Sequence, residues 1–159
     1  MRLPNDSAPL RVVQPPNDDF AIQIEGHREL VPNGWYEAKF CGHDTALMFK
    51  QPKVFLRFEI VQQGEFFDKG IRLARPYRVR RVAPPAGPNG KFVLDAGGDL
   101  YRMLLRVLDV KQRRDRISLL ALKHLPLKIR TRTVTKDREQ RDLPSLAQYS
   151  VVEDVARAD

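Results

Sequence analysis

Apolar and polar residues alternate most regularly over residues 53–61, KVFLRFEIV. Successive side chains of a β-strand point to opposite faces. One face of this segment would be wholly apolar, with Val54, Leu56, Phe58 and Ile60. The other face would carry Lys53, Phe55, Arg57 and Glu59. The pattern predicts a strand with one buried face and one open face.

Weaker alternation predicts further strands, and helical spacing predicts two helices. The further strand candidates are residues 20–25, 34–42, 71–82, 127–137 and 148–155. The clearer helix candidate is 98–110, whose apolar residues recur at i, i+3, i+4, i+7 and i+8: Leu100, Met103, Leu104, Val107 and Leu108. We expect Asp99 to be its N-cap. A second short helix is expected over 118–125, ended by Pro126.

The order of these elements indicates a fold. After the short leading strand come three strands, a helical interlude and two strands. This is the order of the oligonucleotide/oligosaccharide-binding (OB) barrel. Pro76 cannot donate to a ladder, so the strand 71–82 is expected at a sheet edge or bulged. The prediction is a mainly β protein with α+β content: a five-stranded OB-like barrel with a helix between strands three and four.

The chain has 159 residues, which is enough for one domain. Residues 1–19 hold four prolines among Asn and Asp residues, which is typical of a flexible arm. Residues 20–159 are expected to form a single OB-like domain.

Little in the sequence indicates an oxidising compartment or a membrane. Cys41 is the single cysteine, so a disulfide framework is excluded. The N-terminus lacks the apolar centre of a signal peptide. No apolar run approaches the roughly 18 residues of a spanning helix. We therefore expect a cytoplasmic protein without a membrane partner.

The charge balance indicates the class of partner. Lys and Arg outnumber Asp and Glu by 28 to 20, for a formal net charge of +8. A surplus of this size favours polyanionic partners, of which nucleic acid is the first candidate.

Four runs of the sequence resemble a family of small proteins of phages, plasmids and integrated mobile elements. They are GWYEAKF (34–40), PKVFLRFEIVQQGEFFDKGIRLARPYRV (52–79), DLYRMLLRVLD (99–109) and LPLKIRTRTVTKD (125–137). Members of that family are regarded as single-stranded-DNA-binding-like OB folds, and the resemblance covers roughly residues 33–155. It rests on a pattern of core and turn residues, which includes Phe58, Ile60, Gly64 or Glu65, and Phe66. The resemblance therefore implies a fold and a broad role but no site residue.

The C-terminus departs from bacterial-type single-strand binders, which end in an acidic tail with a terminal Phe. Here the chain ends VVEDVARAD, in which Arg157 interrupts the acidic residues and no Phe closes the chain. Recruitment of partners through such a tail is not expected.

The outward faces of the first three barrel strands carry the candidate binding residues. If Tyr36, Ala38 and Phe40 face the core, the neighbouring positions face out. The outward aromatic and cationic set is then Trp35, Lys39, Phe55, Arg57, Arg72, Arg78 and Arg80. Single-stranded nucleic acid offers base faces for stacking, worth about 1–3 kcal/mol each, and a backbone of regularly spaced negative charge.

The hypothesis is that Arg78 and Arg80 pair with consecutive phosphates while Phe55 or Trp35 stacks a base. The alternatives are that Trp35 closes a core edge and that the arginines form an ordinary solvated surface.

A second basic region lies in the C-terminal half. Arg130, Arg132 and Lys136 share a strand face with Val134, and the loops 111–116 and 135–141 are basic. We expect this region to lie beside the groove, although internal ion pairs could neutralise it.

Enzymatic and metal-binding patterns are not found. The sequence contains no carboxylate set of nuclease type and no phosphate-binding G-x-x-x-x-G-K-[ST] loop. The segment PAGPNGK (85–91) ends in Gly-Lys but lacks that spacing and the helix that should follow. Cys41 and His43 have neither nucleophile–base nor zinc spacing, and are expected to be a buried thiol and a loop imidazole. We expect no catalysis, metal or cofactor.

The sequence therefore predicts a single-stranded DNA-binding protein with little sequence preference, acting in replication or recombination of a phage or mobile element. DNA is favoured over RNA, and replication or recombination proteins and a second copy of the chain are candidate partners. The rival hypothesis is an OB-fold protein–protein module or inhibitor within a nucleic-acid-processing complex.

Overall fold

The computed structural model describes residues 30–64, 69–108 and 116–158. The expected arm (1–19), the leading strand (20–25) and most of the basic loop 111–116 lie outside the described residues. Within them the protein is mainly β, as predicted, and no helix has the length and apolar character needed to cross a bilayer.

The strands in chain order are β1 (Gly34–Met48), β2 (Gln51–Ile60), β3 (Arg72–Arg78), β4 (Arg81–Val82), β5 (Phe92–Val93), β6 (Leu127–Val134) and β7 (Tyr149–Arg157). Helix α1 (Asp99–Val107) follows β5, and two 3₁₀ helices, η4 (Leu119–His124) and η5 (Ser145–Ala147), precede β6 and β7. The second short helix of the prediction is thus present, in 3₁₀ form.

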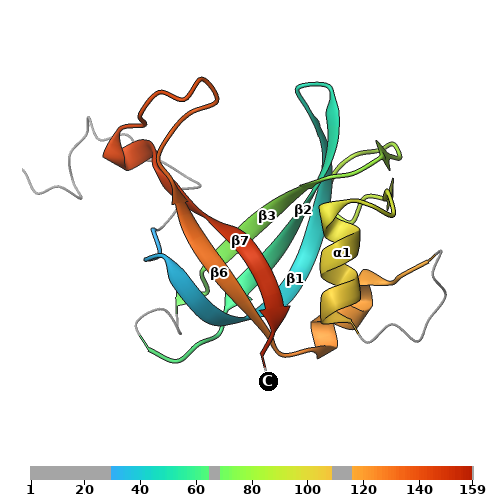
Figure 1. The fold of residues 1–159 in the computed structure, drawn as a ribbon, viewed down its shortest axis with the longest axis horizontal. Helices are drawn as coiled ribbons and strands as arrows, with labels where there is room; N and C mark the ends of the chain where they lie inside the picture. Colours follow the sequence, from blue (N-terminus) through green and yellow to red (C-terminus); the bar gives the residue numbers. More distant parts are fainter. Residues whose placement is uncertain (1–29, 65–68, 109–115, 159) are drawn as a thin grey trace, which may run out of the picture.

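Five strands form one antiparallel sheet in the order β3–β2–β1–β6–β7, and β4 and β5 form a separate small hairpin. The large sheet is strongly curved (Figure 1). Its two edge strands, β3 and β7, come within 8 Å of each other between Cα atoms. Pro76 lies on the edge strand β3, as its missing N–H required.

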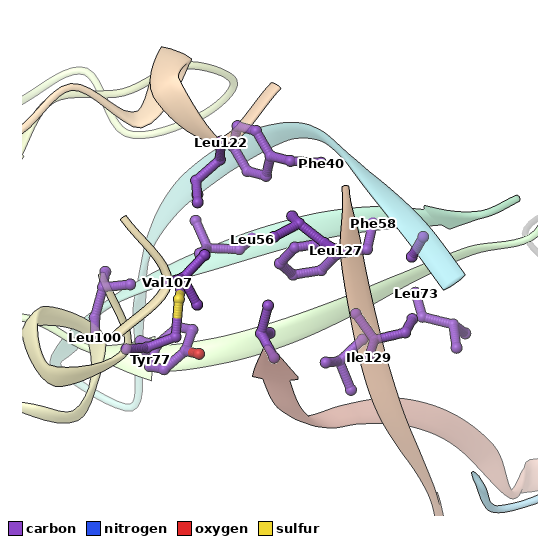
Figure 2. Close-up of a cluster of buried hydrophobic side chains, with 14 of the residues drawn as sticks. Phe40, Leu56, Phe58, Leu73, Tyr77, Leu100, Val107, Leu122, Leu127 and Ile129 are labelled. Carbon is purple, nitrogen blue, oxygen red and sulfur yellow. The ribbon is translucent and has the colours of Figure 1, made fainter. Parts of the chain in front are cut away.

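The apolar face of β2 lies at the centre of the core. Val54, Leu56, Phe58 and Ile60 are all buried, which confirms the alternation predicted from the sequence. Side chains of the sheet, α1 and η4 converge on this cluster (Figure 2). A fully buried side chain of this size stabilises the fold by about 1.5–3 kcal/mol, so the alternation provides much of the driving force for sheet formation.

Helix α1 buries the predicted stripe, Leu100, Met103, Leu104 and Val107. The prediction of Asp99 as the N-cap is wrong. Gly98 takes the extended cap conformation, and the Asp99 carboxylate lies 3.5 Å from Arg102 instead. The helix contacts both β3 and β7. Arg106 fastens it to β7 by donating to Asp154 Oδ1 at 2.9 Å and to the carbonyl of Val155 at 2.8 Å.

Strand β1 is longer than predicted because a bulge between Phe40 and Gly42 keeps it in register with β2 beyond the expected end. Gly42 has φ +146°, a conformation that side chains rarely adopt. A bulge inserts one residue and shifts the alternation beyond it. Asp44 therefore faces outward with Lys39, while His43 turns toward the β4–β5 side. The expectation of a loop imidazole is wrong, since His43 lies within β1, and the Cys41 thiol is half-buried rather than buried.

Candidate functional site

The outer face of β1, β2 and β3 carries five of the candidate residues, as the alternation predicted: Lys39, Phe55, Arg57, Arg72 and Arg78. The strand register decides their neighbours. Lys39 is opposite Glu59, which is opposite Arg72; Phe55 is opposite Pro76.

Carboxylates neutralise the part of this face farther from the β1–β2 turn. Glu59 lies between two cations and accepts a hydrogen bond from Arg72 Nε at 3.3 Å, with Lys39 Nζ 3.6 Å away. The Glu59 carboxylate on β2 thus forms an ion pair with one cation on each flanking strand. Exposed pairs of this kind add at most about 1 kcal/mol, but they reduce the positive potential available to a ligand.

The centre of the face is also ion-paired. Arg57 Nη1 donates to Asp44 Oδ2 at 2.6 Å. The bulge allows this ion pair in two ways. It turns the Asp44 side chain outward, and it places Gly42, which has no side chain, beneath the Arg57 guanidinium. A Cβ on Gly42 would lie 3.1 Å from Arg57 Nη2. Arg57 Nε is buried without a hydrogen-bond partner within the described part of the chain.

The end of the face nearer the β1–β2 turn differs from the rest. Lys53 and Arg78 are directly opposite each other on β2 and β3. Neither has a carboxylate partner among the described residues. Like charges at directly opposed positions destabilise a sheet. The next pair along, Phe55 and Pro76, adds apolar surface beside the two cations. We call Lys53, Phe55, Pro76 and Arg78 the cationic patch.

The expected row of arginines does not continue past Arg78. Strand β3 ends there, and Arg80 lies beyond it, where its Nη1 donates to Asp95 Oδ1 at 3.0 Å. Arg80 N donates to the carbonyl of Val93, which joins this segment to β5. Arg78 and Arg80 therefore do not share one strand face.

Trp35 lies at the other end of β1, and its side chain is exposed. Lys128 Nζ and Arg130 Cζ lie 5.4 and 5.6 Å from its ring centroid. Asp44 is the residue of β1 that lies opposite Phe55 in the strand register. Trp35 precedes Asp44 by nine residues, which is about 30 Å along a strand. The two aromatic residues proposed for base stacking therefore occupy separate sites.

The second basic region is largely ion-paired. Arg130 and Arg132 share Glu153, with N–O distances of 3.1 and 3.8 Å. Lys136 was expected on the strand, but β6 ends at Val134, and Lys136 Nζ donates to Asp142 Oδ1 at 2.8 Å. The internal pairing that the sequence left open thus applies to all three cations.

One feature of the face was missed in the sequence, namely the tip of the β1–β2 hairpin. Met48 pairs with Gln51, so the turn consists of Phe49 and Lys50, with φ of +53° and +62°. Bulky residues rarely adopt positive φ, and Asn-Gly is the usual choice for such a turn. The Phe49 side chain in this turn is 61% exposed. The signal in the sequence was a Phe-Lys pair between two alternating segments.

The hairpin tip contacts the loop that joins β6 to β7. The Arg138 guanidinium lies over the Phe49 ring, 3.7 Å from its centroid. Both segments project from the same end of the sheet (Figure 1). An exposed aromatic ring in a strained turn, with an arginine over one face, is available to a flat ligand.

Catalytic or metal chemistry gains no support from the described residues. They contain no cluster of three or more His, Cys, Asp or Glu side chains placed to hold a metal ion. Burial raises the pKa of the Cys41 thiol, and its S–H group donates to the carbonyl of Lys39 at 3.6 Å. A thiol in this state is a poor nucleophile at neutral pH.

Comparisons of the chain with protein-family models, curated proteins and solved structures found no match.

Proposed function

We propose that this protein binds single-stranded DNA with little sequence preference, as a non-catalytic cytoplasmic protein in replication or recombination of a phage or mobile element. The observation that carries the proposal is the opposed pair Lys53 and Arg78. These two cations, without a carboxylate partner in the described part of the chain, repel each other across adjacent strands. Two phosphates would remove that repulsion and form two ionic contacts.

The aromatic residues favour single-stranded over double-stranded nucleic acid. Phe55 is partly exposed beside the two cations, and Phe49 is exposed at the hairpin tip. Unpaired bases can stack on such rings, whereas the base faces of a duplex are already stacked. A ring accepts any base, so the proposal predicts little sequence preference.

The topology supports an OB-like barrel as the scaffold. The order β3–β2–β1–β6–β7, the approach of β3 to β7 and the position of α1 between β3 and β6 in the chain agree with that fold. In OB folds the face of strands two and three and the loops after strands one and four contact the ligand. The corresponding parts here are the cationic patch, the Phe49–Lys50 turn and the loop that holds Arg138.

The test is a fluorescence-anisotropy titration with a labelled thymidine homopolymer at two salt concentrations, with a duplex of equal length as the comparison. We expect the single strand to bind more tightly than the duplex, and its affinity to fall steeply as salt rises. A chain without intrinsic affinity for either nucleic acid would refute the proposal and favour the protein–protein module.

A further inference from the structure

A cavity of about 950 Å³ lies on the other side of β1 from Arg57. It lies among β1, the β4–β5 hairpin, α1 and the segment that leads into η4. Its walls are mainly apolar and include three aromatic rings, those of Phe40, Phe92 and Tyr101. Ligand sites for small molecules typically have this size and an apolar lining with few polar groups.

One wall of the cavity is the loop that contains PAGPNGK, and it is tightly bound to β1. Thr45 N donates to the carbonyl of Gly87, and Asn89 N donates to the carbonyl of His43, both at 2.9 Å. Gly90 packs so closely on Thr45 that an added Cβ would lie 1.9 Å from Thr45 Oγ1. The loop is therefore held in place before any ligand binds, and with it the position of Lys91.

His43 belongs to the same wall. Its Nε2 lies 2.9 Å from the carbonyl oxygen of Gly90, and since a carbonyl only accepts, Nε2 carries the hydrogen. Nδ1 is left as the second polar atom of the ring. The ring also packs edge to face with Phe92, with 5.5 Å between the centroids. The aromatic part of the cavity is thus fixed by both a hydrogen bond and ring packing.

The charged side chains among the described lining residues are all positive. Lys91 follows the fixed loop, while Arg116 precedes η4 and Lys123 lies within it. All three side chains are exposed. None of them forms an ion pair within the described part of the chain. None of the described lining residues is an Asp or Glu. Three cations of one cavity, without a carboxylate partner among the described residues, can bind one multivalent anion, since charge-assisted hydrogen bonds to phosphate oxygens are strong.

We propose that this cavity binds a nucleoside phosphate, with the base against the aromatic wall and the phosphate held by Lys91, Lys123 and Arg116. The rings favour a flat aromatic group, and the cations favour a phosphate attached to it. The ligand is either a free nucleotide or the phosphorylated end of a strand. The site is separate from the cationic patch, so it goes beyond the proposed function and does not depend on it.

The experiment is a titration of the ¹⁵N-labelled full chain with dAMP, followed by amide NMR. We expect saturable shifts centred on Gly90 and Lys91. Deoxyadenosine, which lacks the phosphate, should bind at least about tenfold more weakly, because it loses its charge-assisted hydrogen bonds. Absence of saturable binding of dAMP would overturn the proposal, and so would equal affinity for deoxyadenosine.

Two double variants separate the cavity from the cationic patch. Lys91→Ala/Lys123→Ala should weaken dAMP binding about tenfold or more and leave thymidine-homopolymer binding near the parent value. Lys53→Ala/Arg78→Ala removes the same charge from the other face and should leave dAMP binding unchanged. Equal loss of dAMP affinity in both variants would show a general charge effect and overturn the assignment of the cavity.

The source of the ligand is distinguished by two oligonucleotides that differ only in a 5′-phosphate. Shifts at Gly90 and Lys91 with the phosphorylated strand but not with the unphosphorylated one, in a chain that also binds dAMP, would assign the cavity to strand ends. Shifts with dAMP but with neither strand would assign it to free nucleotides. Either result supports a nucleoside-phosphate site. Strand binding lost in Lys53→Ala/Arg78→Ala, with dAMP binding retained, would show that the two proposals stand separately.

Discussion

Replacing the opposed cations tests the proposed strand-binding face most directly. In Lys53→Ala/Arg78→Ala, binding of a labelled thymidine homopolymer should weaken at low salt and recover relative to the parent as salt rises. The reason is that both side chains lack a carboxylate partner among the described residues, so each is available for one phosphate.

The magnitude follows from the number of contacts. Each phosphate contact to a single strand contributes about 0.7 to the slope of log affinity against log salt, so two lost contacts should flatten the slope by about 1.4. The variant should therefore fall behind the parent by about 25-fold for each tenfold decrease in salt. Its stability should not fall, because the substitution also removes a like-charge pair.

The matched control is Lys39→Ala/Arg72→Ala, which removes two cations from the same outer face. Both already share Glu59, so their loss should change the slope much less. The assay is fluorescence anisotropy at four or more salt concentrations, with urea denaturation to verify that each variant is folded. Equal slopes for the Lys53/Arg78 variant and the parent would refute the reasoning, as would a larger change in the control.

Three further substitutions test other parts of the structure. Phe49→Ala should weaken strand binding by about 1–3 kcal/mol without changing the salt slope, whereas Leu146→Ala, at a side chain 92% exposed on η5, should have no effect in the same titration. Burial raises the pKa of Tyr77 to about 12 from 10.0, so the stability from its neutral phenol is complete below pH 10 and is lost as the pH rises toward 12. Between pH 9 and pH 11 the parent should thus lose about 1.4 kcal/mol more unfolding free energy than Tyr77→Phe in urea denaturation, and equal losses would contradict the burial of the phenol. Leu104→Ala should cost about 2–5 kcal/mol in the same assay, and its exposed neighbour Leu105→Ala less than about 0.5; similar losses would show that α1 packs by another face.

The sequence alone was sufficient for features that depend on local periodicity. The alternation in β2 identified its four buried residues, and the helical spacing in α1 identified the stripe that packs on the sheet. Pro76 indicated an edge strand because it lacks an N–H for a ladder. These predictions succeed because a side chain's face is set by its own strand or helix, whatever packs against it.

The same reasoning could not determine which cations remain unneutralised, because ion pairing depends on residues that are distant in sequence. Glu59 reaches cations on two other strands, and Asp95 takes Arg80 out of the predicted row. Only the strand register shows that Lys53 and Arg78 are directly opposite each other, and among the described residues neither has a carboxylate partner.

Tertiary structure also decided distances and directions that the pattern could not provide. The bulge at Gly42 reverses the alternation, so that Asp44 meets Arg57 on one face while His43 lines a cavity on the other. Composition showed only that the protein is basic. The antiparallel register and the one residue inserted at the bulge determine which cations have a carboxylate neighbour. Both depend on pairing between strands, so no single segment of the sequence reveals them.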